Sequence, residues 1–101
     1  MNKHEVYTVE EIQRRLVPVF TEHDVRRAVL FGSYAAGNAR PNSDVDILVD
    51  SGLRGLALVG LMGHARDALQ KEVDLIDVAN VQPDSRVARE IEKTGVLIYG
   101  G

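Results

Sequence analysis

The stretch of sequence that decides the fold runs from Gly32 to Val49 and reads GSYAAGNARPNSDVDILV. A Gly-Ser turn follows the apolar residues 29–31, and an Asp-x-Asp pair then opens a second apolar segment. Side chains of a strand alternate between its two faces, so Asp44 and Asp46 are expected to point the same way. Two neighbouring carboxylates repel each other unless a cation lies between them.

Carboxylate oxygens suit Mg²⁺, which keeps several waters and completes its shell with substrate phosphates. The Gly-Ser turn offers backbone N–H groups and the Ser33 hydroxyl to such phosphates, and Gly32 allows a close approach of the backbone. The stretch therefore predicts a metal-dependent site for nucleotidyl or phosphoryl transfer.

Helices and strands are expected to alternate along the rest of the chain. A capping box at Thr8 and Glu11 begins the first helix, and Pro18 should kink or shorten its last turn. Strands are expected at 25–31, 44–49, 73–78 and 96–99, and further helices at 56–70 and after Pro83. The buried face of the 56–70 helix is expected to comprise Leu56, Val59, Met62, Ala65 and Leu69. This order predicts an α/β (α+β) domain with a small mixed β-sheet flanked by helices.

Composition narrows the class of protein. The chain has 101 residues, which fits one domain, and 15 acidic against 12 basic residues. No basic stripe is present, so no long nucleic acid is expected as a partner. No apolar run approaches the ~18 residues of a membrane span, so no membrane is expected either. Cysteine and a signal-peptide core are absent, which favours a cytoplasmic location.

The spaced motif GSxxxGxxRxxSDxDxxV resembles the signature of the polymerase-β-like nucleotidyltransferase superfamily. The short chain resembles its minimal members, the MNT-type antitoxin partners of HEPN toxins, from about Val25 to the C-terminus. The resemblance implies the nucleotidyltransferase fold, with 1–101 as a single minimal domain. It also implies ATP as substrate, Mg²⁺ as cofactor, and nucleotide-binding roles for the residues Gly32, Ser33, Arg40 and Ser43.

Two-metal nucleotidyl transfer also needs a third carboxylate near the attacking hydroxyl. Asp74 and Asp77 both lie on the third expected strand, three positions apart, and so should face opposite sides. The family places its third acid early in this strand, in a Val-Asp-Leu context. The resemblance thus implies Asp44, Asp46 and Asp74 as catalytic residues and metal ligands, with Asp77 as the alternative third acid. Asp50 is interpreted as a strand terminator.

Several neighbouring residues keep two interpretations. Many minimal members carry Arg at the position of Ala36, and Arg40 is a candidate to replace that phosphate contact. Ser43 either contacts phosphate or caps the strand entry, and Tyr34 either lies beside the nucleotide or packs in the core. The three histidines, His4, His23 and His64, are expected to be isolated surface residues.

A chain of this length leaves no room for a domain that holds the acceptor hydroxyl. A protein partner is therefore expected to bring it, since an unheld acceptor reacts poorly. The resemblance implies an antitoxin that attaches AMP from ATP to a tyrosine of a HEPN ribonuclease toxin, in a hetero-oligomer. Two alternatives remain: an antitoxin that acts by binding only, and the catalytic subunit of a small-molecule nucleotidyltransferase with a helical partner chain. Exposed apolar residues of 53–62 are candidates for partner contact, unless that helix is buried on two sides.

Overall fold

The structure is a computed structural model that describes residues 5–100 of the chain. Helices and strands alternate, as the sequence predicts. The elements are α1 Val9–Glu22, β1 Arg27–Phe31, α2 Gly32–Ala36, β2 Val45–Asp50, α3 Gly55–Leu69, β3 Val73–Asp77, a 3-10 turn η1 at Val78–Asn80, α4 Arg86–Thr94 and β4 Val96–Tyr99. The expected strands agree with the observed ones to within two residues at each end.

The four strands form one mixed sheet in the order β3-β2-β1-β4. β1 is antiparallel to both β2 and β4, while β2 and β3 run parallel. The expectation of a small mixed sheet flanked by helices is therefore confirmed. The register places Asp46 beside Phe31 of β1 on one side and beside Asp74 of β3 on the other.

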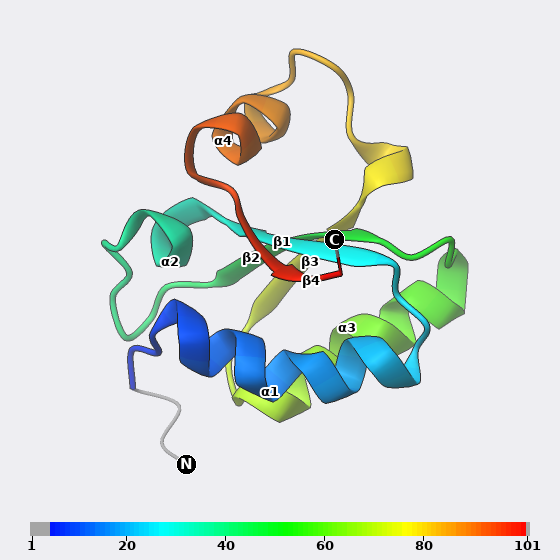
Figure 1. The fold of residues 1–101 in the computed structure, drawn as a ribbon, viewed down its shortest axis with the longest axis horizontal. Helices are drawn as coiled ribbons and strands as arrows, with labels where there is room; N and C mark the ends of the chain where they lie inside the picture. The colour runs from blue at the N-terminus through cyan, green and yellow to red at the C-terminus, as the bar shows by residue number, and fades with distance from the viewer. Residues whose placement is uncertain (1–4, 101) are drawn as a thin grey trace.

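The two faces of the sheet are covered differently (Figure 1). α1 and α3 lie side by side across one face, and the apolar core forms between them and the sheet. α4 lies over the opposite face, and α2 lies at one end of it. On β2 the side chains alternate accordingly, because Val45, Ile47 and Val49 are completely buried whereas Asp46 is only partly so.

The first helix begins at the expected capping box. The Glu11 backbone N–H donates to Thr8 Oγ1 at 3.1 Å, and the Thr8 N–H donates to Glu11 Oε1 at 2.9 Å. The expected shortening at Pro18 does not occur, since α1 continues for another turn to Glu22. Pro18 lies on the exposed side of the helix.

The expected buried face of the third helix is partly wrong. Leu56 is 88% exposed and Val59 is 55% exposed, whereas Leu61, Ala65 and Leu69 are fully buried. The first half of α3 is apolar on every side, so its sequence contains two overlapping stripes of helical period and does not indicate which one packs. Contact with α1 selects the stripe that contains Leu61.

The histidines also differ from expectation. His23 and His64 are not isolated, because His23 Nε2 lies 3.1 Å from His64 Nδ1 and Glu22 Oε2 lies 3.5 Å from the same nitrogen. The two histidines lie 41 positions apart in the sequence, and their contact joins the end of α1 to α3. His4 falls outside the described residues. Over residues 5–100, no helix has the length and apolar character needed to cross a membrane.

Candidate active site

A cavity of about 730 Å³ opens on the α4 side of the sheet, where β1 and β2 meet α2 and α4. It collects residues from four separate stretches of the sequence, 31–38, 43–46, 74–76 and 86–94. Its lining comprises Phe31, Gly32, Ser33, Ala36, Asn38, Ser43, Asp44, Asp46, Asp74, Ile76, Arg86, Val87, Glu90, Lys93 and Thr94. The cavity therefore brings together Gly32, Ser33, Ser43, Asp44 and Asp46 of the sequence motif with residues of β3 and α4 that lie further along the chain.

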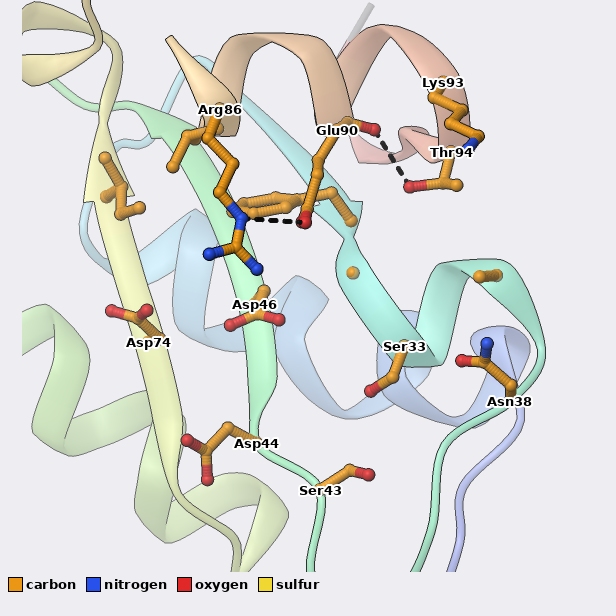
Figure 2. Close-up of a pocket in the computed structure, with 15 residues that line it drawn as sticks. Ser33, Asn38, Ser43, Asp44, Asp46, Asp74, Arg86, Glu90, Lys93 and Thr94 are labelled. Atoms are coloured by element: carbon orange, nitrogen blue, oxygen red, sulfur yellow. Dashed lines mark hydrogen bonds and ion pairs between the residues drawn. The ribbon is translucent and has the colours of Figure 1, made fainter.

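The Gly-Ser turn forms the junction between β1 and α2. Gly32 has a backbone φ of +75°, a conformation that residues other than glycine rarely adopt. A Cβ atom built on Gly32 would overlap the Asp46 carboxylate, so the absence of a side chain lets this carboxylate lie against the backbone of the turn. Ser33 follows directly, and its hydroxyl points into the cavity (Figure 2).

Three aspartates line the cavity. Figure 2 shows Asp46 between Asp74 on one side and Ser33 on the other, with Asp44 below at the entry to β2. Burial raises the pKa of Asp46 to about 6, and the charges of Asp74, Asp44 and Glu90 add to the effect. The site therefore holds negative charge that is not neutralised by the protein alone.

Asp74 lines the cavity, whereas Asp77 does not. Asp77 is 3% exposed on the opposite face of β3, where the Ser51 hydroxyl donates to its Oδ2 at 2.5 Å and the Ala79 N–H donates to its Oδ1 at 3.0 Å. Burial by itself would raise the pKa of Asp77, but these hydrogen bonds outweigh it and lower the pKa. Asp50, at the end of β2, pairs with Arg26 at 3.4 Å and does not line the cavity.

The carboxylates fit a divalent metal that arrives with a nucleotide. Between residues 5 and 100, no three His, Asp or Glu side chains are gathered closely enough to hold an ion on their own. Mg²⁺ does not require such a cage, since it binds through one or two carboxylates together with substrate phosphates. Burial and, after it, the charges of Asp74, Asp44 and Glu90 raise the pKa of Asp46, and a bound cation would relieve the repulsion among these carboxylates.

Arg40, Ser43 and Tyr34 reach different places. Arg40 is exposed and does not line the cavity, while its backbone N–H donates to Ser43 Oγ at 2.8 Å. Ser43 thus stabilises the turn before β2 and also lines the cavity. Tyr34 is 4% exposed and belongs to the apolar core, which favours the packing interpretation.

Sequence reasoning missed three charged residues of α4. Arg86, Glu90 and Lys93 all line the cavity, and Arg86 Nε lies 3.7 Å from Glu90 Oε1. Figure 2 shows the Arg86 guanidinium extending over Asp46. Their spacing of four and three residues does predict a shared helix face. Only the packing of α4 over the sheet turns that face toward the carboxylates.

Comparison with known proteins identifies the family of the chain. The family model described as "Polymerase beta, Nucleotidyltransferase" matches residues 14–101. The chain is 39% identical to the "Putative protein adenylyltransferase MJ0435" of Methanocaldococcus jannaschii over 77 residues, which cover 74% of this chain and 83% of that protein.

Solved structures are also similar. A toxin–antitoxin crystal structure with AMP-PNP contains a chain that is 25% identical, with a TM-score of 0.76 over 88% of this chain and 73% of that one. A structure of a tri-AMPylated Shewanella oneidensis HEPN toxin in complex with an MNT antitoxin contains a chain with a TM-score of 0.71 at 20% identity, over 93% and 74% of the two chains. The second of these shows the fold alone. The family model and the Methanocaldococcus relative together establish that this chain belongs to the polymerase beta nucleotidyltransferase family.

Proposed function

We propose that the protein is a Mg²⁺-dependent adenylyltransferase antitoxin that transfers AMP from ATP to a tyrosine hydroxyl of a HEPN ribonuclease toxin. The observation that carries this proposal is the shared cavity of the Gly32-Ser33 turn and the carboxylates of Asp44, Asp46 and Asp74. The names of the similar proteins, an adenylyltransferase and a toxin–antitoxin complex with an ATP analogue, support the same class of reaction.

The turn and α4 are suited to hold the triphosphate. Ser33 offers its hydroxyl and backbone N–H to phosphate oxygens, and the glycine before it permits close contact. Arg86 and Lys93 provide positive charge at the same cavity, the role for which the family resemblance made Arg40 a candidate. An arginine guanidinium can donate two parallel hydrogen bonds to a phosphate group, whereas a lysine ammonium acts as a point charge. Arg86 is therefore a stronger candidate than Lys93 for the phosphate contact.

The carboxylates are suited to hold the metal and the reacting hydroxyl. Asp44, Asp46 and Asp74 would bind Mg²⁺, which supplies charge stabilisation to the phosphates and lowers the pKa of a bound hydroxyl. In the transfer, the acceptor oxygen forms a bond to the α-phosphorus of ATP. The bond from that phosphorus to the oxygen bridging to the β-phosphorus breaks, and pyrophosphate leaves with the electron pair. The hydroxyl proton passes to Asp74.

The partner protein would supply what the described residues do not offer, a held acceptor hydroxyl. The exposed apolar side chains of Leu56 and Val59 on α3 lie outside the acidic cavity and are the candidates for that contact. A hetero-oligomer follows from this arrangement. The alternative interpretation, a helix buried on two sides, does not hold at these two positions, because their side chains are 88% and 55% exposed.

The test is to mix the protein with the product of the gene encoded beside it, labelled ATP and Mg²⁺, and to analyse both chains by mass spectrometry. AMP on a tyrosine of the partner, formed only when Asp44 is intact, supports the proposal. An Asp44→Asn variant that neutralises the partner as well as wild type, without adduct, favours an antitoxin that acts by binding only. Transfer of AMP to a small molecule in the presence of a helical partner chain favours the catalytic subunit of a small-molecule nucleotidyltransferase.

A further inference from the structure

A second cavity adjoins the candidate active site. Its volume is about 440 Å³, and it lies between the loop that enters β2 and the turn that joins α3 to β3. Ser43 and Asp44 line both cavities, so the second one reaches the carboxylates from the end of the parallel strands. The proposed nucleotide contacts do not use the rest of its lining, which comprises Pro41, Asn42, Arg66, Asp67, Gln70, Lys71 and Glu72.

The geometry of transfer points the acceptor toward this side. Attack on phosphorus is in line, so the acceptor hydroxyl and the leaving pyrophosphate lie on opposite sides of the α-phosphorus. The phosphate contacts proposed above, Ser33 and Arg86, lie on one side of Asp44. The second cavity lies on its other side, since it contains Asp44 but neither of those two residues.

The charge of the second cavity selects the kind of acceptor. Its two cations are both engaged, because Arg66 Nε lies 3.3 Å from Glu72 Oε2 and Lys71 Nζ donates to the Pro41 carbonyl at 3.0 Å. Among residues 5–100, the carboxylates of Asp44 and Asp67 have no ion pair or hydrogen bond. The cavity therefore presents a net negative potential to whatever enters it, which disfavours a phosphate-bearing acceptor.

We infer that this second cavity binds the acceptor as a polypeptide segment with basic or neutral residues beside the reacting hydroxyl, and that Asp67 helps to select it. The inference rests on the proposed function, which leaves the acceptor's place in this protein open. An acceptor segment lying here presents its hydroxyl at Asp44, next to the metal-binding carboxylates. The negative charge disfavours nucleic acids and phosphorylated metabolites at this position.

Two synthetic peptides test the inference, one with lysines and one with glutamates on either side of the same tyrosine. Labelled AMP transfer is measured with Mg²⁺ for wild type, Asp67→Lys and Glu92→Lys. Both replaced residues are exposed acids in the last turn of a helix, where lysine is favourable, and both variants change the net charge equally. Glu92 lines neither cavity and so serves as the matched control.

Wild type and Glu92→Lys should label the lysine peptide about tenfold more efficiently than the glutamate peptide, and Asp67→Lys should abolish or reverse that preference. Calorimetry with ATP and Mg²⁺ should give the same affinity for all three proteins. An unchanged preference in Asp67→Lys, or no labelling of either peptide, would overturn the inference. Labelling of the intact HEPN protein by wild type in the same series separates this failure from failure of the proposed function.

Discussion

The two faces of the sheet use acidic residues in opposite ways. On the face covered by α1 and α3, the only acid of β3 is Asp77, which is buried and accepts hydrogen bonds from Ser51 and Ala79. On the α4 face, Asp46 and Asp74 lie side by side in the cavity and repel each other. The pKa of Asp77 is lowered and that of Asp46 is raised, although both belong to neighbouring strands.

This difference separates stability from function within one sheet. An acid that is satisfied by hydrogen bonds stabilises the fold, whereas acids that crowd together cost stability unless a ligand compensates them. The α1/α3 face is thus closed and self-sufficient, and the α4 face is completed by a cation and a nucleotide in our proposal. Variants at matched positions on the two faces test this distinction.

The largest expected effect is that of Asp44→Asn or Asp46→Asn on transfer. Each variant should reduce transfer at least about 100-fold, because a metal ligand is lost. Thermal stability without metal should hold or rise, since removing one charge relieves repulsion. Labelled-ATP transfer to the partner and thermal melting in EDTA measure the two quantities. Near-wild-type transfer in both variants would place the active site elsewhere.

A split is expected between the two acids of β3. Asp74→Asn should lose about 100-fold in transfer with an unchanged melting temperature, because a proton acceptor is lost from an exposed position. Asp77→Asn should lose about 1–3 kcal/mol of stability while folded protein keeps its activity, because a buried hydrogen-bond network is disturbed. Denaturant unfolding and transfer rates are measured on both. The reverse ranking would make Asp77 the third acid.

A smaller effect is expected at the two candidate arginines. Arg86→Gln should weaken binding of ATP with Mg²⁺ about tenfold, because a guanidinium at the cavity is lost. Arg40→Gln, at an exposed position outside the cavity, should change the affinity less than twofold. Calorimetry decides between them. A larger loss of ATP affinity in Arg40→Gln than in Arg86→Gln would indicate that Arg40 makes the phosphate contact that the family resemblance implies.

The smallest effect is a pH dependence of stability in the absence of metal and nucleotide. The pKa of Asp46 rises from 3.8 to about 6 on folding, so its contribution favours the folded state at pH below 3.8 and is lost as the pH rises to about 6. The loss should be about 1–2 kcal/mol once solvent screening of this partly exposed group is allowed for. The difference in unfolding free energy between wild type and Asp46→Asn, measured across this range, reports it.

Asp77 should give the opposite slope. Because its pKa is lowered on folding, its contribution is present above pH 3.8 and is lost as the pH falls below that value. Comparison of wild type with Asp77→Asn at pH 3 and pH 6 isolates this contribution. Parallel pH profiles for the Asp46 and Asp77 variants would contradict the distinction between the two faces.

The sequence alone predicted the local features of this protein well. The Gly-Ser turn, the Asp-x-Asp strand, the capping box at Thr8 and the order of helices and strands depend on residues near one another, and local preferences express such signals directly. The side-chain period of a strand also predicted that Asp74 and Asp77 face opposite ways. The family signature lies within 18 consecutive residues and is visible without any structure.

Tertiary packing decided what local patterns leave open. α3 offers two apolar stripes, and contact with α1 selected the one that buries Leu61 and leaves Leu56 exposed. His23 and His64 meet only because α1 and α3 pack together. Arg86 and Lys93 lie at the cavity because α4 packs over this face of the sheet, while Arg40, nearer in sequence to the aspartates, is exposed and does not line the cavity. In each case the sequence supplied a residue with suitable chemistry, and the long-range packing of helices on the sheet determined which of its possible neighbours it met.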